Sequence, residues 1–170
     1  ASQLPIVADP AVTDYLTRLG TTLAEATDRP GLEWRFHVVN SAEVNAFAVP
    51  GGYVYVNRGL IEQAASLREL AGVLGHEVNH VALRHSAEQL ESQTRTQVGV
   101  GLVCSLTGWC EGAAAQVAIN AAGAAWFARH SREDEAEADS AAVATLVRAG
   151  IDPEGVPAMF ARLLAARERQ

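Results

Sequence analysis

The sequence predicts an α+β fold that is mainly helical, with a small sheet beside one long helix. Apolar residues recur at helical spacing over residues 10–30 and over most of the chain after residue 59. Between residues 33 and 57, apolar and polar residues alternate and turn residues interrupt them, which indicates strands. With 170 residues, 49% of them hydrophobic, the chain suits a single domain over residues 1–170 with a buried core.

The first helix is predicted over residues 10–30, with Asp9 as its cap and Pro10 in its first turn. The small sheet over residues 33–57 is expected to be largely antiparallel. The last of its three extended runs, Tyr53-Val54-Tyr55-Val56, is rich in aromatic and β-branched residues, and Pro50-Gly51-Gly52 separates it from the second run as a turn.

The helices expected after the sheet share helical spacing of apolar residues, and they cover residues 59–65, 66–94, 96–127, 131–149 and 153–168. Ser66, with Glu69 three residues on, predicts a capping box, Ser131 is a further cap, and Gly150 ends its helix. The apolar segment 96–127 is interrupted at 109–112, and its runs are shorter than the about 20 residues of a membrane span. We therefore expect a helical hairpin there.

Composition excludes several kinds of chemistry. A net charge of −7 disfavours nucleic acid, whose phosphates require a basic surface. All thirteen basic residues are Arg, so mechanisms that need a lysine Schiff base or a P-loop lysine are excluded. Cys104 and Cys110 are expected to form a disulfide in an oxidising compartment, and their spacing is not that of zinc ligands.

The strongest chemical signal is the run His76-Glu77-Val78-Asn79-His80 inside the predicted helix 66–94. Two His residues four positions apart project from one helix face and can bind the same zinc ion. Glu77 follows the first of them and can activate a water held by the metal. The pattern also arises by chance, but apolar neighbours would make two His and a Glu costly to bury without a ligand.

A catalytic zinc needs a third protein ligand, which the acidic run 131–139 can supply. Glu135 and Asp139 lie four residues apart on one predicted helix face, so Glu135 could bind the metal while Asp139 accepts a hydrogen bond from a ligating His. Glu133 or Glu137 could replace Glu135 on these grounds. A structural zinc site usually has four protein ligands, whereas three converge here, which favours catalysis.

Three segments in this order resemble the M48 family of zinc peptidases, which includes the CAAX-prenyl proteases, the HtpX heat-shock proteases and periplasmic relatives. They are Asn45–Gly52, His76–His80 with its extension Arg84-His85-Ser86, and Ser131-Arg132-x-x-Glu135-x-x-x-Asp139. The resemblance implies a zincin-like fold and one Zn²⁺ per chain. It selects Glu135 as the third ligand, because in that family the glutamate four residues before the aspartate binds the metal.

The resemblance is greatest to compact periplasmic members, and it implies a metalloendopeptidase that acts on unfolded or misassembled polypeptides in the bacterial periplasm or envelope. Association with a membrane or with outer-membrane assembly is compatible with it. The Cys pair and the absence of an initial Met support the same compartment. The alternative is a chaperone-like or latent module that binds clients through the apolar segment and rarely cuts.

A strand beside the metal is expected to pair with extended substrate through main-chain hydrogen bonds. The residues assigned to this substrate edge are Asn45, Ala46, Phe47, Ala48, Gly51 and Gly52. The candidates for stabilising the transition state are Arg132, His130, Tyr53 and Tyr55. For Arg132, the alternative is a structural role as a partner of nearby carboxylates. We interpret His37 and His85 as structural or surface residues.

Overall fold

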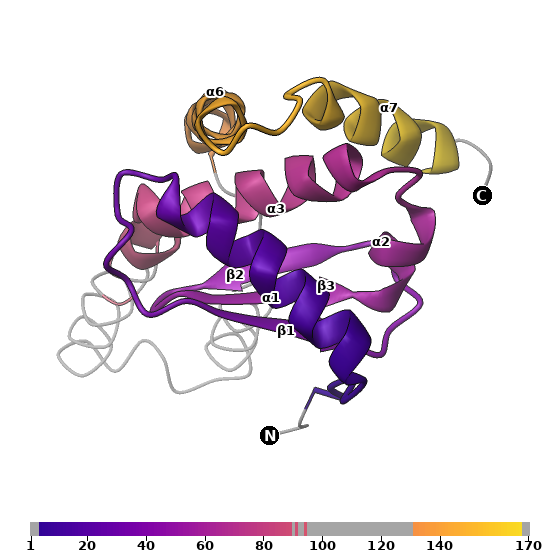
Figure 1. Ribbon diagram of the computed structural model, residues 1–170. Helices are drawn as coiled ribbons and strands as arrows, with labels where there is room; N and C mark the ends of the chain where they lie inside the picture. The colour runs from indigo at the N-terminus through magenta and orange to yellow at the C-terminus, as the bar shows by residue number, and fades with distance from the viewer. Residues whose placement is uncertain (1–3, 90, 92–93, 95–130, 168–170) are drawn as a thin grey trace, which may run out of the picture.

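The computed structural model of the chain describes residues 4–89, 91, 94 and 131–167, which form helices around a small sheet (Figure 1). The elements in chain order are α1 (Pro10–Glu25), β1 (Arg35–Val39), β2 (Ala46–Val49), β3 (Tyr53–Asn57), α2 (Arg58–Gln63), α3 (Leu67–Ala82), α6 (Arg132–Arg148) and α7 (Gly155–Arg167). This confirms the predicted α+β class. The apolar segment 96–127, the two cysteines and His130 lie outside the described residues.

The sheet is mixed, with the strand order β1–β3–β2. Strand β2 pairs with β3 in antiparallel fashion, as expected, whereas β1 pairs with β3 in parallel, so the prediction of a largely antiparallel sheet is wrong for that pair. Gly51 and Gly52, with φ of 99° and 88°, make the tight turn that folds β3 back onto β2. Strand β3 therefore becomes the central strand, and β2 is left at an edge.

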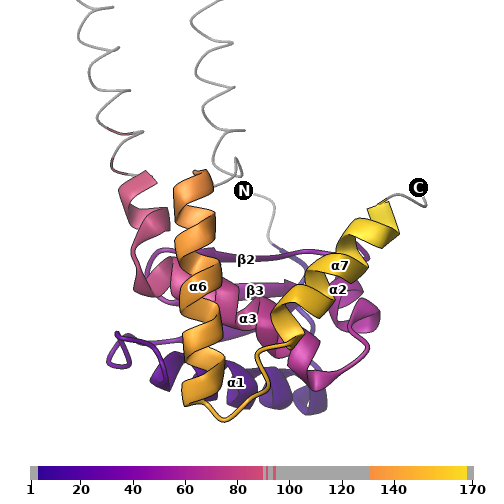
Figure 2. The ribbon, with the colours of Figure 1, turned by 90° about the horizontal axis from the view of Figure 1, so that it is seen from above.

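Three layers place α3 at the centre of the molecule. Helices α1 and α3 cover one face of the sheet, and α6 and α7 pack on the other side of α3 (Figures 1 and 2). The core between these layers contains the fully buried side chains of Leu16, Leu23, Val38, Val54, Val56, Leu60, Leu74, Val78, Leu146 and Met159. One helix is thus in contact with the edge strand, with α6 and with α7 at once.

Side-chain capping marks where two of the helices, α1 and α6, begin. The Asp9 side chain accepts the Ala11 N–H at the start of α1, and Ser131 forms a capping box with Asp134 at the start of α6. The capping box expected at Ser66 is not formed: its hydroxyl makes no capping bond, and Glu69 accepts the N–H of Ala65 instead. Helix α6 ends as predicted, with Gly150 at φ 70°.

Helix α3 ends at Ala82, and the expectation of one continuous helix over 66–94 is wrong in its last part. Arg84 adopts a left-handed conformation with φ 72°, and the backbone is helical again from His85 to Gln89. The sequence does not predict this break, because neither Leu83 nor Arg84 is a glycine or a proline.

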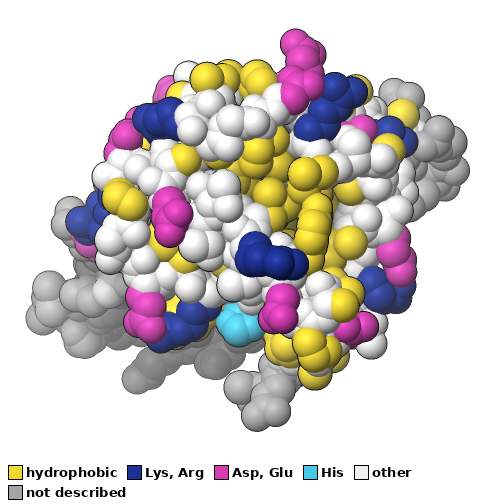
Figure 3. All heavy atoms as spheres, viewed as in Figure 1, with side chains coloured by type: hydrophobic (Ala, Val, Ile, Leu, Met, Phe, Trp, Pro, Cys, Tyr) yellow, Lys and Arg dark blue, Asp and Glu magenta, His cyan; other side chains and the backbone are white. Residues whose placement is uncertain are grey.

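On the face seen in Figure 3, acidic and basic side chains are interspersed and apolar side chains gather in the middle. Within the described ranges, none of the helices combines the length and the apolar character that crossing a membrane requires.

Candidate metal centre

The centre begins with two buried histidines on α3, one turn apart. His76 is 7% exposed and His80 is 2% exposed, and their Nε2 atoms lie 2.9 Å apart. Small residues let α6 approach this helix closely. A Cβ on Gly75 would lie in ordinary contact with Ala142 and Leu146 of α6, so the two backbones pack with little between them. The approach brings the acidic first turns of α6 over the histidines.

Glu135 completes the group from α6. Its Oε2 lies 3.6 Å from His76 Nε2, and its Oε1 lies 3.7 Å from His80 Nε2. Ligand atoms of a tetrahedral ion with bonds of about 2.0–2.1 Å are about 3.3 Å apart. The three observed separations lie on both sides of that value, so His76, His80 and Glu135 could hold a metal ion.

The neighbouring glutamates of α6 lie elsewhere. Glu133 is exposed, and the Glu137 carboxylate lies 3.3 Å from His85 Nε2. Sequence reasoning alone left Glu133 and Glu137 open as replacements for Glu135, and the structure brings Glu135 to both histidines.

Each histidine of the pair has its second ring nitrogen engaged. His76 Nδ1 lies 2.8 Å from Asp139 Oδ1, one turn along α6 from Glu135. His80 Nδ1 lies 3.0 Å from Nδ1 of His85, which is only 5% exposed. Sequence reasoning interpreted His85 as a structural or surface residue. In a continuous helix it would point about 140° away from His80. The break at Arg84 brings it back.

Glu77 lies beside this group with its carboxylate in an unfavourable environment. Burial, together with the nearby Glu135 carboxylate, raises the pKa of Glu77 to about 8, against the lowering effect of a hydrogen bond from the Ala48 backbone. A divalent cation at this point would offset both causes, since it favours the ionised form of each carboxylate. The cluster is therefore electrostatically suited to a cation.

The hydrogen bond to Glu77 comes from β2, at an edge of the sheet that pairs with no further strand within the described residues. The Asn57 N–H donates to the Asn45 carbonyl, and Phe47 lies opposite Tyr55. In an antiparallel ladder, residues that bond the partner strand alternate with residues whose polar groups point outward. The main-chain groups of Ala46 and Ala48 therefore point to the open edge, on the side where Glu77 lies.

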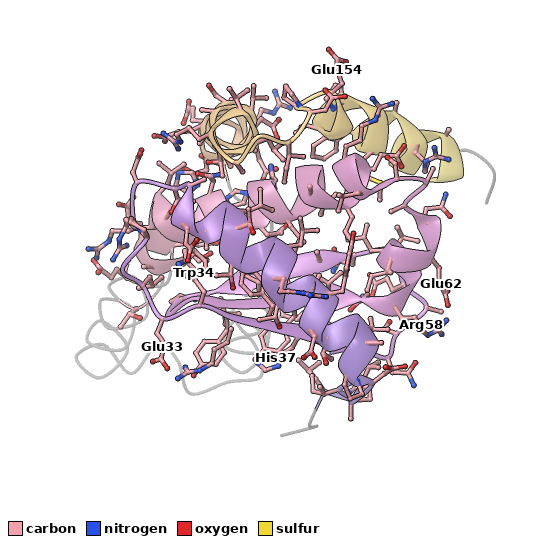
Figure 4. The ribbon with its side chains drawn as sticks, viewed as in Figure 1. Glu33, Trp34, His37, Arg58, Glu62 and Glu154 are labelled. Atoms are coloured by element: carbon pink, nitrogen blue, oxygen red, sulfur yellow. The ribbon has the colours of Figure 1, made fainter. Side chains whose placement is uncertain are left out.

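The remaining candidates lie away from the histidines. Tyr53 and Tyr55 alternate with the buried Val54 and Val56, so their rings lie on the face of the sheet opposite α3. His37 lies on that outer face (Figure 4), and its ring stacks with those of both tyrosines. Gly51 and Gly52 lie in the turn after β2.

Two further residues come from the helices packed on α3. Arg132 is exposed at the first position of α6, three residues before Glu135. Phe160 of α7, which no sequence signal singled out, has its ring 5.8 Å from that of His76 and is 37% exposed.

The sequence of this chain is similar to those of several known proteins. The beta-barrel assembly-enhancing protease of Escherichia coli (strain K12) is 31% identical over 166 residues, covering 94% of this chain and 34% of that protein. Metalloprotease LoiP of the same strain is 31% identical over 162 residues, covering 94% of this chain and 63% of LoiP. The mitochondrial metalloendopeptidase OMA1 of Schizosaccharomyces pombe is 29% identical over 152 residues, covering 89% and 44%.

The chain spans about a third of the length of the beta-barrel assembly-enhancing proteases that it matches. The model of peptidase family M48 matches residues 10–166, which include both histidines, the acidic turns of α6 and the edge strand. Because that match covers most of the sequence, this chain belongs to peptidase family M48.

Proposed function

We propose that this chain is a zinc-dependent endopeptidase domain that hydrolyses peptide bonds of unfolded or misassembled proteins. The observation that supports it most directly is the convergence of His76, His80 and Glu135 beside the carboxylate of Glu77. Two imidazole nitrogens and one carboxylate are a known ligand set of catalytic zinc, which leaves a fourth position open.

His76, His80 and Glu135 would hold the zinc ion. When bound, the ion supplies Lewis acidity, which makes a water nucleophile available near neutral pH and polarises a substrate carbonyl. Asp139 orients His76 by accepting a hydrogen bond from Nδ1, so that Nε2 keeps its lone pair for the ion.

Glu77 would act first as the general base and then as the general acid. Its carboxylate takes a proton from the attacking water as the C–O bond forms, and it delivers that proton to the leaving amide nitrogen as the C–N bond breaks. The amide N–H of Ala48 orients the carboxylate from the adjacent strand. A glutamine at this position would keep the shape and lose this proton transfer.

The edge of β2 would bind the substrate. An extended peptide can pair with the outward N–H and carbonyl of Ala46 and with the outward carbonyl of Ala48, whereas the Ala48 N–H donates to Glu77. These main-chain hydrogen bonds recognise the peptide backbone rather than its side chains. Such binding accepts many sequences but requires an unfolded segment. Phe160 adds an apolar surface next to His76.

We place this activity in the bacterial envelope, most plainly the periplasm. Relatives of Escherichia coli, Vibrio cholerae and Yersinia pestis named for enhancing beta-barrel assembly support that setting and an association with outer-membrane assembly. These relatives are longer than this chain, so it is an inference that the chain acts on the same class of substrate.

The experiment compares the wild type with Glu77→Gln for zinc content, casein cleavage and binding of unfolded casein. We expect one zinc per chain in both proteins and cleavage in the wild type alone, with the variant slower by about two orders of magnitude or more. Glu133→Gln, an exposed glutamate on α6, is the matched control and should cut like the wild type.

Two results would contradict the proposal. Fully zinc-loaded wild type that cuts no peptide, while both proteins bind casein, would identify a client-binding module instead. Unchanged cleavage by Glu77→Gln would remove the assigned proton carrier.

A further inference from the structure

Beyond the ligand set, His85 makes an unusual contact with a buried ring nitrogen. Its Nδ1 lies 3.0 Å from His80 Nδ1, and its Nε2 lies 3.3 Å from the Glu137 carboxylate. A series of two hydrogen bonds thus leads from His80, at the proposed metal position, through His85 to the carboxylate of Glu137. The Glu137 side chain is 63% exposed.

The positions of the ring protons decide which group donates and which accepts in each of these two hydrogen bonds. If His80 binds zinc through Nε2, that nitrogen needs its lone pair and the ring proton must be on Nδ1. His85 Nδ1 then has to accept this proton in a hydrogen bond, so the His85 proton is on Nε2. From there it is donated to Glu137, whose carboxylate can only accept.

We propose that His85 and Glu137 are positioning residues that fix the tautomer and orientation of His80 for metal binding. The inference rests on the proposed metal site. It gives the two histidines equivalent supports: His76 is held directly by a carboxylate of α6, and His80 is held by a carboxylate of the same helix through an intervening imidazole.

The backbone around His85 is shaped for this contact. Residues five apart on a regular helix point about 140° away from each other, so His80 and His85 could not meet in an uninterrupted α3. The left-handed Arg84 redirects the chain, and His85 is buried to 5% exposure as a result. A left-handed non-glycine residue is costly, and such residues concentrate at functional sites.

The test measures the zinc affinity of metal-stripped protein by competition with a chromogenic chelator, and the visible spectrum after loading with Co²⁺. His85→Leu removes the acceptor, and we expect zinc to bind about 10- to 100-fold more weakly, with an altered Co²⁺ spectrum. His85→Gln restores a carbonyl acceptor and should recover most of the affinity. His37→Leu, on the outer face of the sheet, controls for loss of a histidine.

A second pair of variants covers the case in which His85→Leu fails to fold. Glu137 is exposed, so Glu137→Ala should fold, and we expect about a two- to fivefold loss of zinc affinity. Glu133→Ala makes the same charge change on the same helix without contacting His85, and should bind like the wild type.

Several outcomes overturn the inference. His85→Leu with wild-type zinc affinity would do so, as would equal losses in His85→Leu and His85→Gln, or equal affinities in Glu137→Ala and Glu133→Ala. Wild-type protein that binds no zinc would contradict the proposed function instead, which keeps the two failures distinct.

Discussion

At the scale of single residues, the left-handed Arg84 carries a measurable cost. Its φ of 72° costs a non-glycine residue about 1–2 kcal/mol, and glycine avoids that cost but loses about 0.5–1 kcal/mol of backbone entropy. We therefore expect Arg84→Gly to leave the free energy of unfolding unchanged or to raise it by up to about 1.5 kcal/mol. The β-branched Arg84→Val should lower it by about 1–2 kcal/mol. Urea unfolding measures both, with Arg84→Ala as the control for the lost side chain.

The same residue marks the limit of sequence reasoning at this scale. The pair His76 and His80 could be found because spacing by four residues fixes a shared helix face. His85 could not be found, because its contact with His80 depends on a backbone break that an arginine does not announce. Glu135 could be separated from Glu133 and Glu137 only through family resemblance, since their chemistry is the same.

At the scale of elements, the contact between α3 and α6 depends on a buried polar pair. The Asn79 amide donates to the Gly75 carbonyl at 2.8 Å and to Thr145 Oγ1 at 3.1 Å, and Thr145 is fully buried. We expect Asn79→Ala and Thr145→Val each to lower the free energy of unfolding by about 0.5–1.5 kcal/mol, because each removes the buried hydrogen bond between the two helices.

A double-mutant cycle isolates this contact from the packing around it. The combined variant should be more stable than the sum of the single losses predicts, by about 1 kcal/mol, because both partners are then gone. Additive losses in urea unfolding would show that the hydrogen bond between the two helices contributes nothing.

A second pair of elements, α3 and α7, is joined by an ion pair that makes stability depend on pH. The Glu69 carboxylate receives Arg162 Nε at 2.9 Å and Nη2 at 3.1 Å. The hydrogen bond from Arg162, helped by the Ala65 N–H, holds the pKa of Glu69 below its usual value near 4.5. The unfolded chain therefore binds a proton before the folded chain does, and the stabilisation is present above that value and is lost as the pH falls through the lowered pKa.

The corresponding prediction compares the wild type with Glu69→Gln. At pH 7 the variant should be less stable by about 1.5–3 kcal/mol, the range for hydrogen bonds to charged groups. The difference should shrink as the pH falls below about 4.5, because wild-type Glu69 then becomes neutral as well. Urea unfolding at several pH values measures it, and a difference that does not depend on pH would contradict the assigned ionisation.

At the scale of the whole molecule, periodicity was enough for the fold class but not for the path of the chain. The alternation of apolar and polar residues in β1 and β3 predicts that each is a strand with one buried face. It does not predict whether the two strands run parallel or antiparallel, because the same alternation fits both arrangements. Only the assembled sheet shows that β3 lies between its two predecessors and leaves β2 at the edge. That placement decides which main-chain groups face Glu77.

The proposed metal would connect parts of the molecule that are distant in sequence, because His76 and His80 lie on α3 and Glu135 lies on α6. Zinc bound to the folded state alone stabilises it by about 2.7 kcal/mol when free zinc is 100 times its dissociation constant. For a chain of this size, that corresponds to a rise in melting temperature of about 5–11 °C. Differential scanning calorimetry of stripped protein, with and without Zn²⁺, measures the shift.

Two controls make that measurement specific. Mg²⁺ prefers oxygen ligands and should leave the melting temperature unchanged, and Glu135→Ala should reduce the zinc-dependent rise because only the two imidazoles remain. An equal rise with zinc in the wild type and in Glu135→Ala would place the binding elsewhere on the molecule. A rise confined to the wild type would instead mean that one ion couples the stability of α3 to that of α6, so that chelation loosens the same contact that positions the site.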